Sequence, residues 1–145
     1  MKAVLPLLLL LPLAAHATLG GGADSIDTDG SRLHSARHAA TAGAAYATHT
    51  LELPTGTTVR EFLNASGAVF AVSWSGPFPP DLRQLLGDSY YQQYHDTALT
   101  RPGRHAVHLR QSGLMLDVGG HARHFSGRAW VPGLLPAGVS AAGLP

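Results

Sequence analysis

The stretch VFAVSWSGPFPPDLRQLLGDSYYQQY, from Val69 to Tyr94, decides the fold of this chain. It begins with an almost continuous apolar run ending at Trp74, which is typical of a strand covered on both faces. The prolines that follow cannot continue a sheet, because proline has no backbone N–H to donate. Apolar residues then recur at helical spacing, which predicts one main amphipathic helix from Asp81 onwards with a break at Gly87. A strand joined through a rigid corner to a helix indicates a domain that mixes α and β structure.

Short segments with strand character lie on both sides of this stretch. Residues 48–53 and 57–63 precede it, and residues 105–110, 114–118 and 122–131 follow it, with turn sequences between them that include Gly119-Gly120. We therefore expect an α+β domain whose antiparallel sheet consists of two short meanders, with one main amphipathic helix packed on a face. Simple alternation divides the central strand into two sets, Phe70, Val72 and Trp74 on one face and Val69, Ala71 and Ser73 on the other.

The first 17 residues have the pattern of a secretory signal peptide. A short positive start, Met1-Lys2, precedes an apolar run, and Ala15 and Ala17 are small residues at the positions that a signal peptidase reads. The apolar run is too short to span a membrane, which takes about 20 residues. We expect cleavage near Ala17, a periplasmic or secreted protein, and no stable membrane insertion after cleavage. The rest divides into a flexible N-terminal lead with a possible short helix (18–48), an α+β core domain (49–131) and a Pro/Gly-rich C-terminal tail (132–145).

Composition excludes several classes of function. The chain has no cysteine, so it can form no disulfide framework and has no thiol chemistry. Beyond Lys2 it carries nine arginines against nine carboxylates, which gives no net charge with histidines neutral. Nucleic-acid binders usually carry a basic excess, so we expect no nucleic-acid partner.

Three motifs resemble those of a known bacterial family. They are the strand G-x-V-F-A-V-x-W at residues 67–74, the corner G-P-x-x-P-D-L-R-x-L-L-G at 76–87 and the strand F-S-G-R-A-x-V-P at 125–132. Together with a signal peptide and the start Thr18-Leu19-Gly20-Gly21, they resemble the exported family catalogued as domain of unknown function 2844. The resemblance covers nearly the whole chain after the signal. It implies export and no assigned activity, so no catalytic residue can be carried over.

Histidines and carboxylates are the main candidates for chemistry. His34 and His38 are four apart, which would place them on one face of a helix at metal-ligand spacing, and they are the weak metal candidates. The pairs His105/His108 and His121/His124 are three apart, so a regular strand would point them to opposite faces unless a turn or bulge intervened. The segment SIDTDG resembles the start of a calcium loop, but Ala36 stands where the bidentate glutamate is required.

Catalytic patterns are weak. Ser126 and His124 would share a face of one strand, but no acid follows to orient the histidine. Glu52 and Glu61 lie on adjoining segments and would suit a paired-acid site only if they faced one cleft. We expect no cofactor.

The sequence therefore favours a non-enzymatic binding or accessory module for an envelope protein or peptide. The proline corner and the helix start are the expected binding surface, with Phe78, Asp81, Arg83 and Tyr91 as its candidate residues. Two alternatives stay open: a hydrolase of an envelope polymer with a site assembled from histidines and carboxylates, and a histidine-based metal binder.

Overall fold

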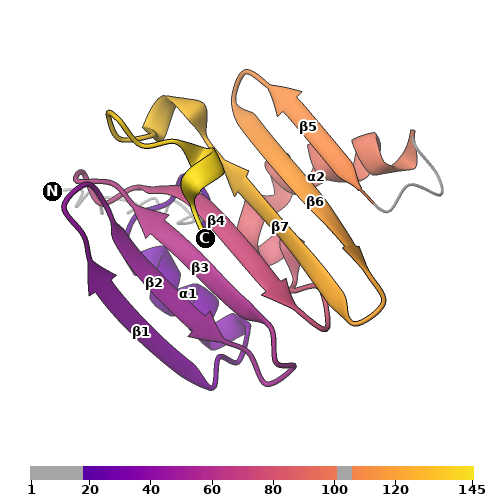
Figure 1. The fold of residues 1–145 in the computed structure, drawn as a ribbon, viewed down its shortest axis with the longest axis horizontal. Coiled ribbons are helices and arrows are strands. Elements are labelled where there is room, and N and C mark those ends of the chain that lie inside the picture. Colours follow the sequence, from indigo (N-terminus) through magenta and orange to yellow (C-terminus); the bar gives the residue numbers. More distant parts are fainter. Residues whose placement is uncertain (1–17, 101–105) are drawn as a thin grey trace, which may run out of the picture.

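The computed structural model describes residues 18–100 and 106–145, so the predicted signal peptide lies outside the described residues. The fold is α+β, with one seven-stranded antiparallel sheet and two α-helices (Figure 1). No helix among the described residues is long and apolar enough to cross a membrane. In chain order the elements are α1 Asp24–Arg32, β1 Arg37–Ala42, β2 Ala47–Glu52, β3 Thr58–Leu63, β4 Val69–Gly76, α2 Leu82–Leu99, β5 Val107–Gln111, β6 Leu114–His121, β7 His124–Trp130 and the short 3-10 helices Pro132–Leu134 and Ala141–Gly143.

The strands lie in the order β1-β2-β3-β4-β7-β6-β5, and every neighbouring pair is antiparallel. Strands β1 to β4 follow one another directly, and α2 then leads to β5, β6 and β7, the last of which pairs with β4. The first run has four strands where we expected three, because residues 37–42 form β1. This alanine-rich segment has little strand signal of its own, and pairing with β2 decides its structure.

Both helices cover the same face of the sheet (Figure 1). Ile26 of α1 and the leucines of the first turns of α2 pack with the strand residues of that face in the main core. The opposite face, which we call the open face, has a smaller apolar cluster around Phe62 and Phe70. The C-terminal segment lies over this cluster, with Ala141 and Leu144 buried against it (Figure 1).

A β-bulge corrects the expected alternation of β4. Phe62 pairs with Ala71, but the next residue, Leu63, pairs with Val69, so Phe70 is the extra residue. Phe70 and Ala71 therefore belong to the same cluster on the open face, whereas Val69 lies in the main core. Alternation alone cannot locate such an insertion.

The hairpin turn predicted at Gly119-Gly120 is wrong. Strand β6 continues to His121, which pairs with His124, so the turn is Ala122-Arg123, and Arg123 takes the left-handed φ of 68°. Gly120 is required for a different reason: a Cβ there would lie 2.8 Å from the Cα of Phe125 in β7. The glycine allows close approach of two strands instead of a turn.

Helix α2 has no single apolar stripe along its length. Gly87 interrupts it with φ 81° and ψ 163°, so residues after the break are rotated relative to those before it. Leu82, Leu85 and Leu86 are buried in the first part. Tyr91, a candidate binding residue, is half-buried and packs against the core.

Residues 18–48, which we expected to form a lead, contain α1 and β1. Leu19 and Ile26 are part of the main core, and β1 pairs with β2 over six residues. The possible short helix lies at Asp24–Arg32.

Candidate functional site

A row of polar side chains crosses the open face of the sheet. The strand registers place His108 opposite Asp117, Asp117 opposite Arg128, and Arg128 opposite Ser73, each on a neighbouring strand. Arg60 of β3 continues the row on the far side of Ser73. Directly opposite residues of antiparallel strands share a face and have their Cβ atoms about 4.5–5.5 Å apart, so this row is contiguous.

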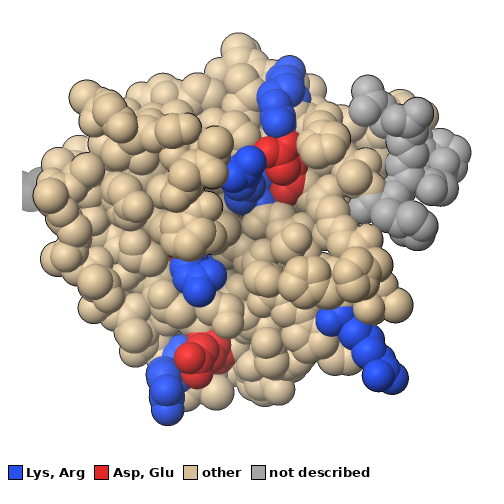
Figure 2. Space-filling model, viewed as in Figure 1, with Lys and Arg blue, Asp and Glu red and all other residues tan. Residues whose placement is uncertain are grey.

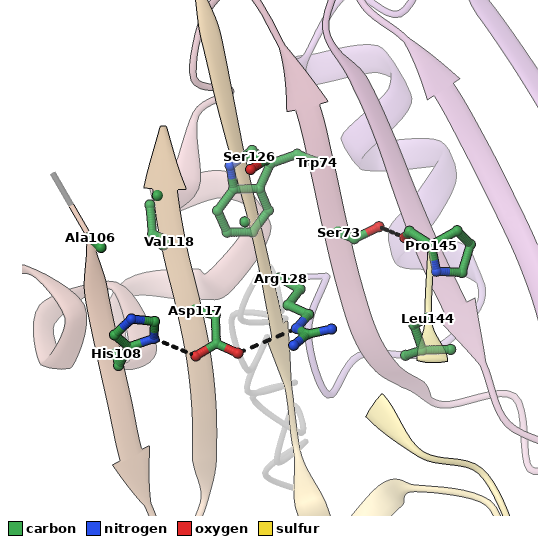
Figure 3. Close-up of a pocket in the computed structure, with 12 residues that line it drawn as sticks. Ser73, Trp74, Ala106, His108, Asp117, Val118, Ser126, Arg128, Leu144 and Pro145 are labelled. Carbon is green, nitrogen blue, oxygen red and sulfur yellow. Dashed lines mark hydrogen bonds and ion pairs between the residues drawn. The ribbon is translucent and has the colours of Figure 1, made fainter. Parts of the chain in front are cut away.

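Asp117 is the centre of the charge cluster in this row. Its Oδ1 accepts a hydrogen bond from His108 Nδ1 at 2.8 Å, and its Oδ2 accepts one from Arg128 Nε at 3.3 Å (Figure 3). A third donor, Arg110 of the next row, also bonds Oδ1. Partial burial alone would raise the pKa of Asp117, but the hydrogen bonds from His108 and the two arginines hold it below its usual value. The carboxylate therefore stays ionised. In Figure 2, basic and acidic side chains, blue and red, meet near the centre of this face.

The C-terminal segment is attached to the same row. Arg128 Nη1 donates to the carbonyl oxygens of Ala141 and Ala142 at 3.3 and 3.2 Å. The hydroxyl of Ser73 donates to an oxygen of Pro145 at 2.6 Å (Figure 3). These bonds fix a peptide segment across the open face.

Beside this segment lies a hollow of about 330 Å³, which we call the sheet hollow. Small residues in β6 and β7 leave the space, and the charge cluster and the end of the C-terminal segment border it. Gly127 is required there, because a Cβ would overlap the Trp74 ring and lie 2.9 Å from the Asp117 carbonyl oxygen. Its lining residues are Ser73, Trp74, Ala106, His108, Asp117, Val118, Gly119, Ser126, Gly127, Arg128, Leu144 and Pro145.

The sheet hollow combines an apolar wall with hydrogen-bond donors. Trp74, Val118 and Leu144 supply the apolar surface, while Arg128 and Ser73 are hydrogen-bond donors. Such a surface suits a ligand with an apolar body and an oxygen acceptor, which includes a peptide segment.

The predicted binding residues lie elsewhere, at the start of α2. Phe78 is 58% exposed in the corner after β4. Asp81 caps α2, since its side chain accepts from the backbone N–H groups of Arg83 and Gln84 at 3.0 and 3.1 Å. Arg83 bonds Asp88 and lies 5.8 Å from the centre of the Tyr91 ring. The corner thus gathers these residues, but Asp81 and Arg83 are engaged in interactions within the helix, and none of the four lines the sheet hollow.

His34 and His38 do not share a helix face, so the spacing argument that made them candidate metal ligands was wrong. Helix α1 ends at Arg32, His34 follows it with a left-handed φ of 53°, and His38 lies in β1. The nearest histidine to His38 is instead His49 of β2, with 2.9 Å between their ring nitrogens. Sequence reasoning missed this pair because it assigned no strand to residues 37–42. In residues 18–100 and 106–145, no three His, Asp or Glu side chains form a ready metal site.

A second polar group is buried on the helix side of the sheet. Glu61 is fully buried, neither of its carboxylate oxygens has a hydrogen-bond partner, and it lies opposite His49 of β2. Burial, and next the charge of Asp29 on α1, raise the pKa of Glu61 to about 9. Burial likewise raises the pKa of Asp29 to about 6, although Gln84 donates a hydrogen bond to it. Glu52 pairs with Thr58 and forms an ion pair with Arg37, so Glu52 and Glu61 do not face one cleft.

The sequence contains a signal for some of the polar residues near the sheet hollow. His108 and Arg110 alternate with apolar residues in one strand, as Asp117 does in the next, which is the pattern of a polar strand face. Which of these side chains meet depends on strand register, and the sequence does not specify it here.

Comparison with known proteins identifies a family. A family model with the description "Protein of unknown function (DUF2844)" matches residues 15–144, nearly the whole chain. No curated protein and no solved structure matches.

Proposed function

The chain belongs to the family described as Protein of unknown function (DUF2844), and we propose that it is an exported, non-enzymatic binding module that holds a peptide segment of an envelope protein in the sheet hollow. The observation that carries this proposal is the combination of an apolar wall and polar side chains in one hollow on the open face. The backbone oxygens of residues 141, 142 and 145 bind to Arg128 and Ser73 beside it. This part of the open face thus already holds peptide carbonyl groups, which supports a peptide as the ligand.

Export is proposed from the signal-peptide pattern of residues 1–17. Cleavage before Thr18 would keep the contacts of Leu19, which is buried and donates its backbone N–H to the carbonyl oxygen of Leu85 at 3.2 Å. From the signal-peptide pattern we propose a periplasmic or secreted protein.

A photo-crosslinking experiment in the native cell tests the binding proposal. A photoreactive amino acid replaces Ala106 at the sheet hollow, Phe78 at the proline corner, or Thr55 in the exposed β2–β3 turn as a control. We expect a discrete cross-linked protein from position 106 and only background from position 55. A product from position 78 alone would move the binding surface to the corner, and background from both would contradict a binding module.

A matched pair of substitutions tests whether the hollow itself is needed. Ser126→Phe fills the sheet hollow from β7, and Ser66→Phe adds the same side chain to an exposed turn. The cross-link from position 106 should disappear in the first variant and persist in the second. Persistence in both would show that the partner does not enter the hollow.

One observation favours a second candidate, a hydrolase of an envelope polymer. His108 lies in the sheet hollow with its Nδ1 on Asp117, an arrangement that can orient a general base. Against it, the Asp117 carboxylate is shared with two arginines. Incubation with purified envelope polymers should release no soluble fragments. Release that His108→Ala abolishes would replace the binding proposal with this one.

A further inference from the structure

A pair of histidines lies at the β1 edge of the sheet, on the face that the helices cover. His38 of β1 and His49 of β2 are diagonal cross-strand neighbours, because His38 pairs with Leu51 and His49 with Ala40. His38 Nε2 is 2.9 Å from His49 Nδ1, and the ring centroids are 5.1 Å apart. Two imidazole nitrogens thus point at one another, and a single proton lies between them.

Two ring nitrogens this close together can act as neighbouring ligands of one metal ion. With metal–nitrogen bonds of about 2.0–2.1 Å, two ligands at a right angle are roughly 2.9 Å apart, and two at the tetrahedral angle are roughly 3.3–3.4 Å apart. The 2.9 Å between the two nitrogens is the length of their hydrogen bond, and a rotation of each ring would let both lone pairs converge on one ion. Square or tetragonal coordination by nitrogen and oxygen is typical of Cu(II) and Ni(II), and Cu(II) binds nitrogen ligands most strongly among the divalent first-row metals.

A carboxylate lies on the other side of His38. Asp27 Oδ1 of α1 is 3.9 Å from His38 Nδ1, which is the nitrogen that does not face His49. Histidines that bind metals usually direct their second nitrogen to a carboxylate, which fixes the tautomer and orients the ring. Asp27 is placed for this role after a small rotation.

We propose that His38 and His49 together bind one Cu(II) ion at adjacent corners of a square-planar or tetragonal site, with water as the remaining ligands and Asp27 as the positioning residue for His38. The ion takes the place of the shared proton, and one ring changes tautomer so that both facing nitrogens present lone pairs. The site is separate from the sheet hollow, since it lies on the opposite face and at the β1 edge.

Copper titration of the purified protein, carrying no histidine tag, tests this site. We expect one Cu(II) per chain at this pair, and an electron paramagnetic resonance spectrum of a tetragonal centre with two imidazole nitrogens. His38→Gln and His49→Gln should each weaken binding about tenfold or more, and Asp27→Asn about tenfold. Zn(II) should bind more weakly than Cu(II), because Cu(II) has the highest affinity for nitrogen ligands among the divalent first-row metals.

The hairpin β6–β7 supplies the matched control. His121 and His124 are also cross-strand neighbours, but their ring centroids are 5.6 Å apart and no hydrogen bond joins their nitrogens. The double variant His121→Gln/His124→Gln should keep the tight copper site. Circular dichroism checks that every variant is folded.

Two results would overturn the proposal. One is copper affinity unchanged in folded His38→Gln and His49→Gln variants. The other, which needs no variant, is a spectrum of the native protein at one equivalent of Cu(II) with fewer than two imidazole nitrogens.

Discussion

Glu61 should make the stability of this protein depend on pH in a range where most carboxylates have no effect. Its pKa in the folded protein is about 9, against 4.5 for the ordinary group. Between these values the folded state keeps a proton that the unfolded state has released. Because the folded state binds more protons, the free energy of unfolding falls as pH rises. Each pH unit costs about 1.4 kcal/mol for one such proton.

The loss in free energy of unfolding depends on the pH range over which it is measured. From about pH 7 to about pH 8.5, the unfolded carboxyl is fully ionised and the folded one largely protonated, so the loss is roughly 2 kcal/mol. Asp29 adds little there, because its pKa is about 6 in the folded state and lower in the unfolded state. Glu61→Gln removes the titrating group while keeping a neutral side chain of similar shape, and it should flatten the curve.

Urea unfolding at several pH values in this window measures the effect. The control is Glu52→Gln, which removes an exposed carboxylate paired with Arg37 and should keep the wild-type slope. Equal slopes in the wild type and in Glu61→Gln would show that Glu61 is ionised in the folded protein, and would refute the reasoning from its burial.

Three further predictions concern stability. Gly127→Ala should destabilise the fold by about 1–3 kcal/mol, because the new methyl group would overlap the Trp74 ring; thermal unfolding measures this, and an unchanged Tm would contradict it. Asp117→Asn should lower the free energy of unfolding at neutral pH, and its difference from the wild type should shrink on acidification. The reason is that the lowered pKa of Asp117 contributes stability that is lost as pH falls through the pKa of the folded state. A difference that does not change with pH would contradict this prediction. Asp81→Ala should cost about 1 kcal/mol through loss of the α2 cap, as seen by urea unfolding, whereas Asp81→Asn should restore most of it.

The carboxyl groups of Asp117 and Glu61 differ in protonation state because their surroundings differ. On the open face, Asp117 is ionised because three cationic or donor side chains surround it. On the helix side, Glu61 has no such partner and is neutral at pH 7. An acid that is buried without a partner is expensive to ionise, so its protonation state follows its surroundings and not its residue type.

Local patterns predicted the parts of the fold that short-range physics controls. The apolar run ending at Trp74, the prolines after it and the break at Gly87 are all present in the structure, because each reflects the chemistry of a few adjacent residues. The α+β class follows from them. Strands that depend on a partner could not be predicted from local patterns. All six residues of β1 are exposed, and this strand forms by pairing with β2.

The sequence by itself determined the central strand and the helix after it, the likeness to a family without assigned activity, and the absence of cysteine chemistry. Tertiary structure decided which side chains meet. The bulge at Phe70 set the faces of β4, and strand register brought His108, Asp117 and Arg128 into one row and His38 beside His49. The physical reason is that register and bulges are fixed by the packing of the whole sheet, and shifting a strand by one residue would move every side chain to the other face.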